Sequence, residues 1–380
     1  MEYFTLSGLL FLIFWAQPSY AMTFTIQFQH WYPQYAPIWK DILQTNCTDQ
    51  YALYLTGFKN HSNIDWRGGG GTLSALTQPV ILCILNNSSD YLQSVLTSAQ
   101  VLLGITPTVL ALLSASNEEL AMLTVVARRP MLASLLALGS PSVYLSRAFD
   151  YCNPKDILEG KNDRLTQWRP AGAAKSAVAM AEYVLAIAAV GNVAHVSYQL
   201  GIRSVSSIWS DTVLGPMIWA LLVIVIHVVG TLSMCFRVRR DMGNTRGIGG
   251  SVDKGPIKWL RNTWWFIREL PSTEMTPSVA QSDMEVTFIK ESPKYIIVSW
   301  FLSPFIICHI IFGTFLMSSL LFLGPKDALG VAGRYMGSVL VCRTILLYEI
   351  AGMREMYLRS KESKESAKSG VTEGLGGAQA

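Results

Sequence analysis

Long apolar runs separated by polar stretches organise most of the chain. The first, residues 91–115, contains no Asp, Glu, Lys, Arg or His. A helix of about 20 apolar residues is long enough to cross the ~30 Å hydrocarbon core of a bilayer. Four later runs have the same character. The pattern therefore predicts an all-α membrane protein with about five transmembrane helices, at residues 91–115, 173–198, 212–236, 295–323 and 335–353.

The stretch after the first run has a different pattern. The Ser-x-x-Glu motif at residues 116–119 is typical of a capping box and indicates that a new helix begins there. If residues 120–145 crossed the membrane, Arg128 and Arg129 would lie near its centre, which is costly unless they are paired. We interpret residues 116–172 as surface amphipathic helices and a loop, with the helices lying on the membrane or dipping into it.

The distribution of basic residues orients these spans. With residues 22–90 outside, the predicted cytosolic segments carry 22 Lys and Arg residues and the opposite side carries 6. Cytosolic loops are enriched in Lys and Arg, so the pattern predicts an external N-terminus and a cytosolic C-terminus. A sixth span would place the basic segments outside. The loop 237–294 and the tail 354–380, which we expect to be disordered because it is rich in Lys, Ser, Glu and Gly, then lie in the cytosol.

The N-terminus has the features of a secretory signal. Residues 1–21 combine an apolar core at 9–16 with a small-residue end at 19–21, so we expect cleavage, with an uncleaved anchor as the alternative. The following segment, residues 22–90, should then form a small extracytoplasmic region. It contains four N-glycosylation sequons, at Asn46, Asn60, Asn86 and Asn87.

This region also contains two cysteines, Cys47 and Cys83. In an oxidising compartment the two thiols would pair and close a loop in a segment too short to build a large core. The alternative is that both are small apolar residues that stay unpaired. We expect the disulfide.

Composition supports the membrane assignment and excludes one class of function. The chain is 51% hydrophobic and 15% charged, whereas soluble domains average about 25% charged residues. Basic residues flank the apolar runs and do not line one face, so we expect no nucleic-acid binding. The expected partners are the lipid bilayer and proteins that the sequence does not name. The expected location is the plasma membrane or a membrane of the secretory pathway.

Six ionisable side chains inside the predicted spans are the candidate functional residues. Because charge is costly in lipid, such groups mark a transport pathway, a catalytic or metal site, or an ion pair between helices, for example Glu182 with Arg343. No helix carries two histidines at metal-ligand spacing, so we expect no metal or cofactor. The candidates are Glu182, His195, His227, His309, Arg343 and Glu349.

The sequence lacks the GxSxG, HExxH, CxxC and DDxxD motifs, so we expect no enzymatic activity. Residues 257–270 have apolar and basic positions at helical spacing, which suits either a helix on an anionic membrane surface or a soluble helix capping the bundle. Our leading hypothesis is a non-enzymatic membrane scaffold or sensor. The alternative is a proton- or solute-coupled transporter that uses Glu182, His195 and His227, and an intramembrane enzyme is the third hypothesis.

One part of the chain resembles a known group of proteins. The pieces are Cys-Ile-Leu at 83–85, LLGITPTVLA at 102–111, Arg-Pro-Met-Leu-Ala at 129–133, Leu-Gly-Ser-Pro at 138–141 and Phe-Asp-Tyr at 149–151. Together they resemble uncharacterised multipass membrane proteins of filamentous fungi, over about residues 83–158. Asn153 stands where that group would have Asp. The resemblance implies a membrane architecture and brings no mechanism with it.

Overall fold

The structure is a computed structural model. It describes residues 25–57, 74–144, 153–160, 170–241, 273–281 and 285–376. Within these ranges the chain forms eleven α-helices, a short 3₁₀ helix and two small two-stranded sheets. The predicted all-α class is therefore confirmed, with two short strand pairs added to it.

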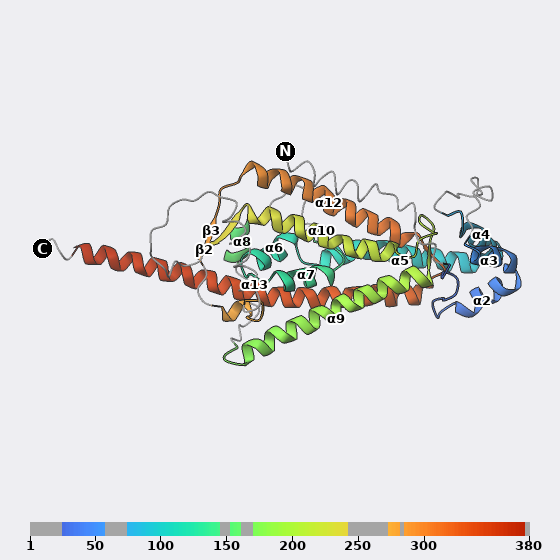
Figure 1. Cartoon of the computed structure of the whole chain (residues 1–380), viewed down its shortest axis with the longest axis horizontal. Coiled ribbons are helices and arrows are strands. Elements are labelled where there is room, and N and C mark those ends of the chain that lie inside the picture. The colour runs from blue at the N-terminus through green and yellow to red at the C-terminus, as the bar shows by residue number, and fades with distance from the viewer. Residues whose placement is uncertain are drawn as a thin grey trace.

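Five helices are long and apolar enough to cross a membrane, as the sequence predicted. They lie side by side in an elongated bundle (Figure 1). Their bounds are α5 (Asp90–Leu113), α9 (Ala174–Arg203), α10 (Gly215–Cys235), α12 (Pro293–Ser318) and α13 (Pro325–Gly376).

The two strand pairs fix the direction of the last four long helices. Strand β1 (Val205–Ser206), which follows α9, pairs with β4 (Leu320–Leu321), which follows α12. Strand β2 (Val238–Asp241), which follows α10, pairs with β3 (Glu285–Phe288), which precedes α12. The long helices α9, α10, α12 and α13 therefore alternate in direction through the bundle.

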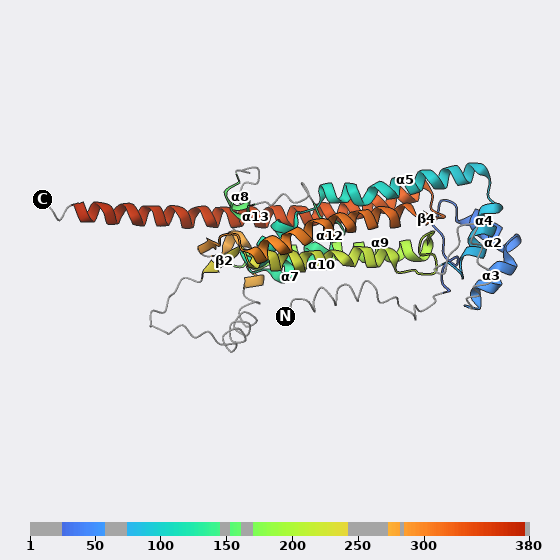
Figure 2. The same ribbon diagram turned by 90° about the horizontal axis from the view of Figure 1, so that it is seen from above.

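Three short helices cover one end of the bundle: α2 (Ala36–Thr45), α3 (Thr48–Leu55) and α4 (Gln78–Asn86). We call residues 25–57 and 74–89 the cap, and the opposite end, where α13 projects beyond the other helices, the distal end (Figure 2). The predicted disulfide between Cys47 and Cys83 is present and joins α3 to α4.

An aromatic cluster holds the cap against the link between α12 and α13. Phe322 is fully buried, and its ring lies 5.5 Å from that of Trp31 and 5.4 Å from that of Trp39. Beside it, the Gln34 backbone N–H donates to Asp327, and the Gln34 side chain accepts from the Lys326 backbone N–H, both at 3.0 Å. The start of α13 is thus fixed directly to the cap.

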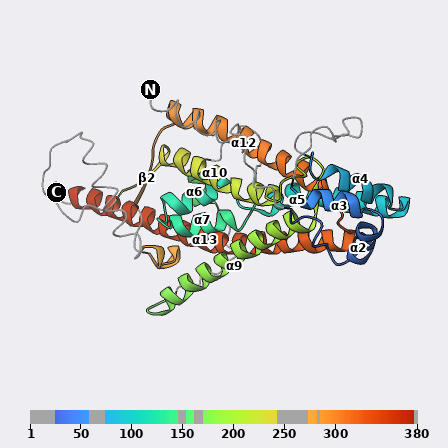
Figure 3. The ribbon, with the colours of Figure 1, turned by 45° about the vertical axis from the view of Figure 1, so that its right-hand side comes forward.

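The helices α6 (Asn117–Val125) and α7 (Pro130–Leu138) form a hairpin inside the bundle. Asn117 packs against Gly230 of α10, and the Ser142 hydroxyl donates to the Pro107 carbonyl of α5. The hairpin therefore begins beside α10, the chain that leaves it reaches α5, and the two helices fill the space between α10 and α13 (Figure 3).

This position corrects the predicted surface location of residues 120–145. The predicted capping box, with Ser116 and Glu119, is confirmed. The two helices, however, carry apolar side chains on several faces, and a helix that is apolar all round belongs in a core. Their fully buried residues include Ala121, Met122, Leu123, Leu132 and Ala133.

Helix α13 is longer than the predicted span 335–353 at both ends. The tail, predicted to be disordered from residue 354, is helical as far as Gly376. Its Lys, Glu, Arg and Ala residues are good helix formers, and a helix that continues an existing one needs no new nucleus. At the start of this extension the Arg354 guanidinium donates to the Ile157 carbonyl of α8 (Pro154–Glu159).

A close approach between α9 and the chain before α10 supports one prediction. A Cβ on Gly201 would lie 1.8 Å from the Val213 carbonyl oxygen, whereas a Cβ on Gly191 of the same helix would meet nothing within 4 Å. Gly201→Ala should therefore lower the free energy of unfolding by about 2–3 kcal/mol through overpacking. Gly191→Ala should be neutral or slightly stabilising because alanine favours helix. Thermal unfolding in detergent measures both, and equal effects would contradict the packing.

Candidate functional site

A fully buried arginine at the tip of the α6–α7 hairpin forms the centre of the candidate site. The chain reverses at Arg128, which has a left-handed φ of 56°, and Pro130 then begins α7. Arg129 lies between them with no exposed surface. Its backbone N–H donates to the Leu123 carbonyl of α6, which closes the turn.

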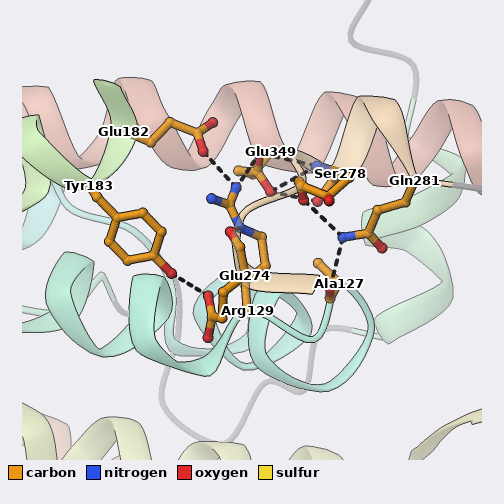
Figure 4. Close-up of polar contacts among 9 residues, drawn as sticks. Ala127, Arg129, Glu182, Tyr183, Glu274, Ser278, Gln281 and Glu349 are labelled. Carbon is orange, nitrogen blue, oxygen red and sulfur yellow. Dashed lines mark hydrogen bonds and ion pairs between the residues drawn. The ribbon is translucent and has the colours of Figure 1, made fainter. Parts of the chain in front are cut away.

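Two carboxylates from different helices meet this guanidinium. Arg129 Nη1 lies 2.6 Å from Glu182 Oε2 of α9 and 2.8 Å from Glu349 Oε1 of α13 (Figure 4). Glu182 is 5% exposed and Glu349 is not exposed at all. The ion pairs therefore bind the hairpin to two long helices out of contact with water.

A segment from the region between α10 and α12, residues 273–281, closes this group. The buried Glu274 side chain accepts hydrogen bonds from the Met131 backbone N–H at 2.8 Å and from the Tyr183 hydroxyl. Its backbone carbonyl accepts from Arg129 Nε at 3.1 Å. The segment thus contacts α7 and α9 through a single glutamate.

The rest of the segment binds α13 and α6. The Ser278 hydroxyl and backbone N–H both donate to Glu349, at 2.5 and 3.3 Å. The Gln281 amide donates to the Ala127 carbonyl at 3.0 Å. We call this set the Arg129 cluster; it comprises Arg129, Glu182, Tyr183, Glu274, Ser278, Gln281 and Glu349.

The cluster contains more acidic than basic groups. Burial alone would lower the pKa of Arg129, but the charges of Glu349 and Glu182 outweigh it and raise the pKa above its ordinary value. The guanidinium therefore stays charged. One cation then faces three buried carboxyl groups, and a buried charge without compensation is costly.

The structure places the predicted pair of Glu182 and Arg343 apart. Glu182 bonds to Arg129, and Arg343 forms its ion pair with Glu119 at the start of α6. The suggested pairing is therefore wrong in its partners. The reason is the hairpin: once it lies inside the bundle, it supplies one partner to each of these residues.

The three intramembrane histidines do not come together. His195 Nδ1 lies 3.3 Å from Arg334 on α13, His309 Nε2 lies 3.1 Å from the Pro141 carbonyl, and His227 is buried on α10. His309 also stacks on Trp219. In the part of the chain that the structure describes, no group of His, Cys, Asp and Glu is arranged to hold a metal.

Three of the four predicted glycosylation sites lie in the cap. Asn46, Asn86 and Asn87 are exposed, and the Asn46 amide donates to the Asn87 side-chain oxygen at 2.8 Å. Asn60 lies outside the described residues, as do the predicted signal segment 1–21 and the predicted amphipathic helix 257–270. Glycosylation and these two segments stay predictions.

Sequence reasoning found two carboxylates of the cluster but missed its other members. The signal for Arg129 is its position immediately before a helix-starting proline, between two apolar runs. Glu274, Ser278 and Tyr183 carry no such signal, because nothing in the local pattern of a polar loop or of an apolar span indicates a buried polar contact.

The comparisons with known proteins add no family assignment. No protein-family model matches the chain, and neither curated proteins nor solved structures gave a match. The resemblance of residues 83–158 to fungal membrane proteins therefore stays a prediction. The function must be argued from the geometry.

Proposed function

We propose that this protein is a non-enzymatic membrane sensor that carries a signal from its cap to its distal end. One observation carries the proposal: α13 is a continuous helix that contacts the cap at its first turn and the Arg129 cluster at Glu349. A helix transmits displacement along its axis because its backbone hydrogen bonds resist bending and stretching.

At the cap, the aromatic cluster around Phe322 would pass a structural change on to the start of α13. This residue has a positive φ of 65°, an uncommon conformation for a bulky residue, and three aromatic rings of the cap surround it. A ligand or partner that rearranged the cap core would displace Phe322 and the start of α13, three residues further on.

At the distal end, the segment 273–281 would change its conformation in response to a movement of α13. Ser278 bonds to Glu349 of α13, so a shift of that helix changes the hydrogen bonds that hold the segment. Met275 at the bend of the segment is 41% exposed. The segment is therefore positioned to present a different surface when α13 moves.

The proposal includes an orientation and a location. The cap lies outside or in the lumen, where a disulfide and glycans form, and the basic distal end lies in the cytosol. The membrane is the plasma membrane or one of the secretory pathway. The partners are the bilayer, which the five long apolar helices support, and proteins bound at the cap and at the distal end.

Hydrogen exchange of the full chain in lipid nanodiscs tests the transmission. Phe322→Ala and Gln34→Ala should each increase amide exchange of residues 273–281 several-fold, because both loosen the cap from α13. Lys40→Ala, an exposed change on the same cap, is the matched control and should leave that exchange unchanged.

Two results would overturn the sensor proposal. One is an increase in exchange confined to the cap and the first turns of α13 in both variants. The other is equal exchange at residues 273–281 in Phe322→Ala and Lys40→Ala. If Phe322→Ala unfolds the cap, Gln34→Ala alone decides, since it removes the hydrogen bond between the Gln34 side chain and the Lys326 backbone N–H and leaves the apolar core in place.

The alternative is a proton- or solute-coupled transporter that uses Glu182, His195 and His227. One observation favours it, namely the excess of buried carboxyl groups over cations around Glu182. Proton flux in proteoliposomes across a pH step tests it. Flux that is present in the wild type and lost in folded Glu182→Gln and His227→Ala would favour the transporter over the sensor.

A further inference from the structure

We propose that the Arg129 cluster binds a proton, held by the carboxyl group of Glu182 and shared with the carboxylate of Glu349. The ligand is thus a proton exchanged with solution, and its site joins α9, α13 and the segment 273–281. The proton would regulate the contact between α13 and the segment 273–281, which the proposed sensor uses. The proton site itself does not depend on the proposed function; only its effect on signalling rests on that function.

The contact between the two carboxyl groups requires the proton. The side chains of Glu182 and Glu349 meet the same nitrogen of Arg129, at 2.6 and 2.8 Å, so the two carboxyl groups lie beside each other. An ionised carboxylate is only an acceptor, so a hydrogen bond between two of them exists only if one carries a proton. Two like charges at this separation in a buried site cannot both stay ionised at low cost.

Glu349 has partners for both of its oxygens. Both of its oxygens accept from the Ser278 backbone N–H, Oε2 also accepts from the Ser278 hydroxyl, and Oε1 forms an ion pair with Arg129 at 2.8 Å. A carboxylate that accepts several hydrogen bonds is stabilised in its charged form. A proton on Glu349 would disrupt at least one of these bonds.

Glu182 has the opposite environment. Its Oε2 accepts from Arg129, but among the described residues its buried Oε1 has no hydrogen-bond partner, a costly state for a charged oxygen. A hydroxyl in place of that charge can donate to Glu349. The same region contains two further buried polar atoms without a partner, Arg129 Nη2 and the hydroxyl oxygen of Tyr348, so the charge around Glu182 is only partly compensated.

One bound proton reduces the excess of negative charge in the cluster. The charged and titratable groups that face Glu182 are Arg129 from the hairpin, Glu274 from the segment, Tyr183 beside it on α9, and Glu349 and Tyr348 on α13. With Glu182 protonated, Arg129 and Glu349 neutralise each other. Glu274 then keeps its own two donors, Met131 and Tyr183.

Proton release would loosen the segment 273–281. As pH rises and Glu182 loses its proton, a second negative charge appears beside Glu349. This charge competes with Glu349 for the guanidinium of Arg129 and repels the carboxylate to which Ser278 donates. The docked state binds the proton and the loosened state releases it, so docking is favoured at lower pH and weakened as pH rises. A sensor built on this joint would transmit more strongly at the lower pH.

Two substitutions separate the roles of the carboxyl groups. Glu182→Gln replaces the protonated acid by a neutral group that still donates to Glu349 and accepts from Arg129, so it should keep the thermal stability of the wild type. Glu349→Gln removes the charge that three donors share and should unfold at a lower temperature. The partly exposed Glu159→Gln of α8 is the matched control for loss of a carboxylate.

Infrared difference spectroscopy in nanodiscs tests the site without any partner. At neutral pH the wild type and Glu159→Gln should show the carbonyl band of a protonated, buried carboxyl group, and Glu182→Gln should lack it. Titration to alkaline pH should remove the band and, after correction for intrinsic rates, increase exchange of residues 273–281 several-fold in the wild type and in Glu159→Gln, but not in Glu182→Gln.

Two results would overturn the proton site. The absence of a protonated-carboxyl band in the wild type means that all carboxyl groups are ionised. A band that survives in Glu182→Gln places the proton on another group. Neither result depends on the cap, so the two proposals can be told apart. The infrared data can disprove the proton site while Phe322→Ala still changes exchange at residues 273–281. Conversely, the exchange data can disprove transmission while the protonated-carboxyl band is still observed. If Glu349→Gln does not fold, Glu182→Gln still decides.

Discussion

Replacing Arg129 with alanine is expected to lower the free energy of unfolding by about 3–5 kcal/mol, enough to leave much of the protein unfolded. The change leaves Glu182 and Glu349 buried without a cation and removes the bond to the Glu274 carbonyl. A buried charge that loses its partner keeps the full cost of its desolvation. Thermal or denaturant unfolding in detergent, followed by tryptophan fluorescence, measures the loss.

The same measurement on Lys155→Ala is the control. This lysine pairs with Glu159 at the surface, and an exposed pair contributes only up to ~1 kcal/mol. Similar losses in Arg129→Ala and Lys155→Ala would show that the cluster is not buried.

Removing the disulfide should destabilise the cap by about 3–4 kcal/mol. Cys47 and Cys83 are separated by 36 residues, and the cross-link removes the entropy of that loop from the unfolded chain. The double variant with serine at both positions tests this, and its serine at position 47 leaves the Asn46 sequon intact. Fluorescence of the buried Trp31 and Trp39 follows unfolding of the cap.

Cys235→Ser, which removes an exposed free thiol, should change the stability of the cap very little. Treating the wild type with a reductant should reproduce the loss seen in the double serine variant. If reduction leaves the tryptophan signal and the midpoint of unfolding unchanged, the bridge contributes nothing and the cap is held by its aromatic core alone.

The long helices of this fold are readable from the sequence. A run such as residues 91–115 has a length and composition that suit few structures besides a membrane-crossing helix, and α5 occupies almost the same residues. The ends were less predictable. The tail beyond residue 353 looked too polar to be ordered, but helix propensity and contact with α8 extend α13 through it.

The hairpin could not be placed from its own residues. Two adjacent arginines, Arg128 and Arg129, made burial of this stretch look costly. The partners that offset the cost for Arg129 lie on helices 53 and 220 residues further along the chain, so the local sequence does not reveal them. A local pattern carries no information about which distant carboxylates will approach. The same limit explains why Glu182 and Glu349 were found as unusual residues while Ser278 and Glu274 were missed.

This separation along the chain determines when the Arg129 cluster can form during synthesis. Arg129 leaves the ribosome long before Glu349, and at 5–20 residues per second the delay for 220 residues is roughly 10–40 s. During that interval the hairpin has no complete set of counter-charges and cannot settle between helices that have not yet been made. Its insertion must therefore be one of the last steps of biogenesis, and a nascent chain that ends before α13 should expose Arg129 to the membrane-protein quality control of the cell.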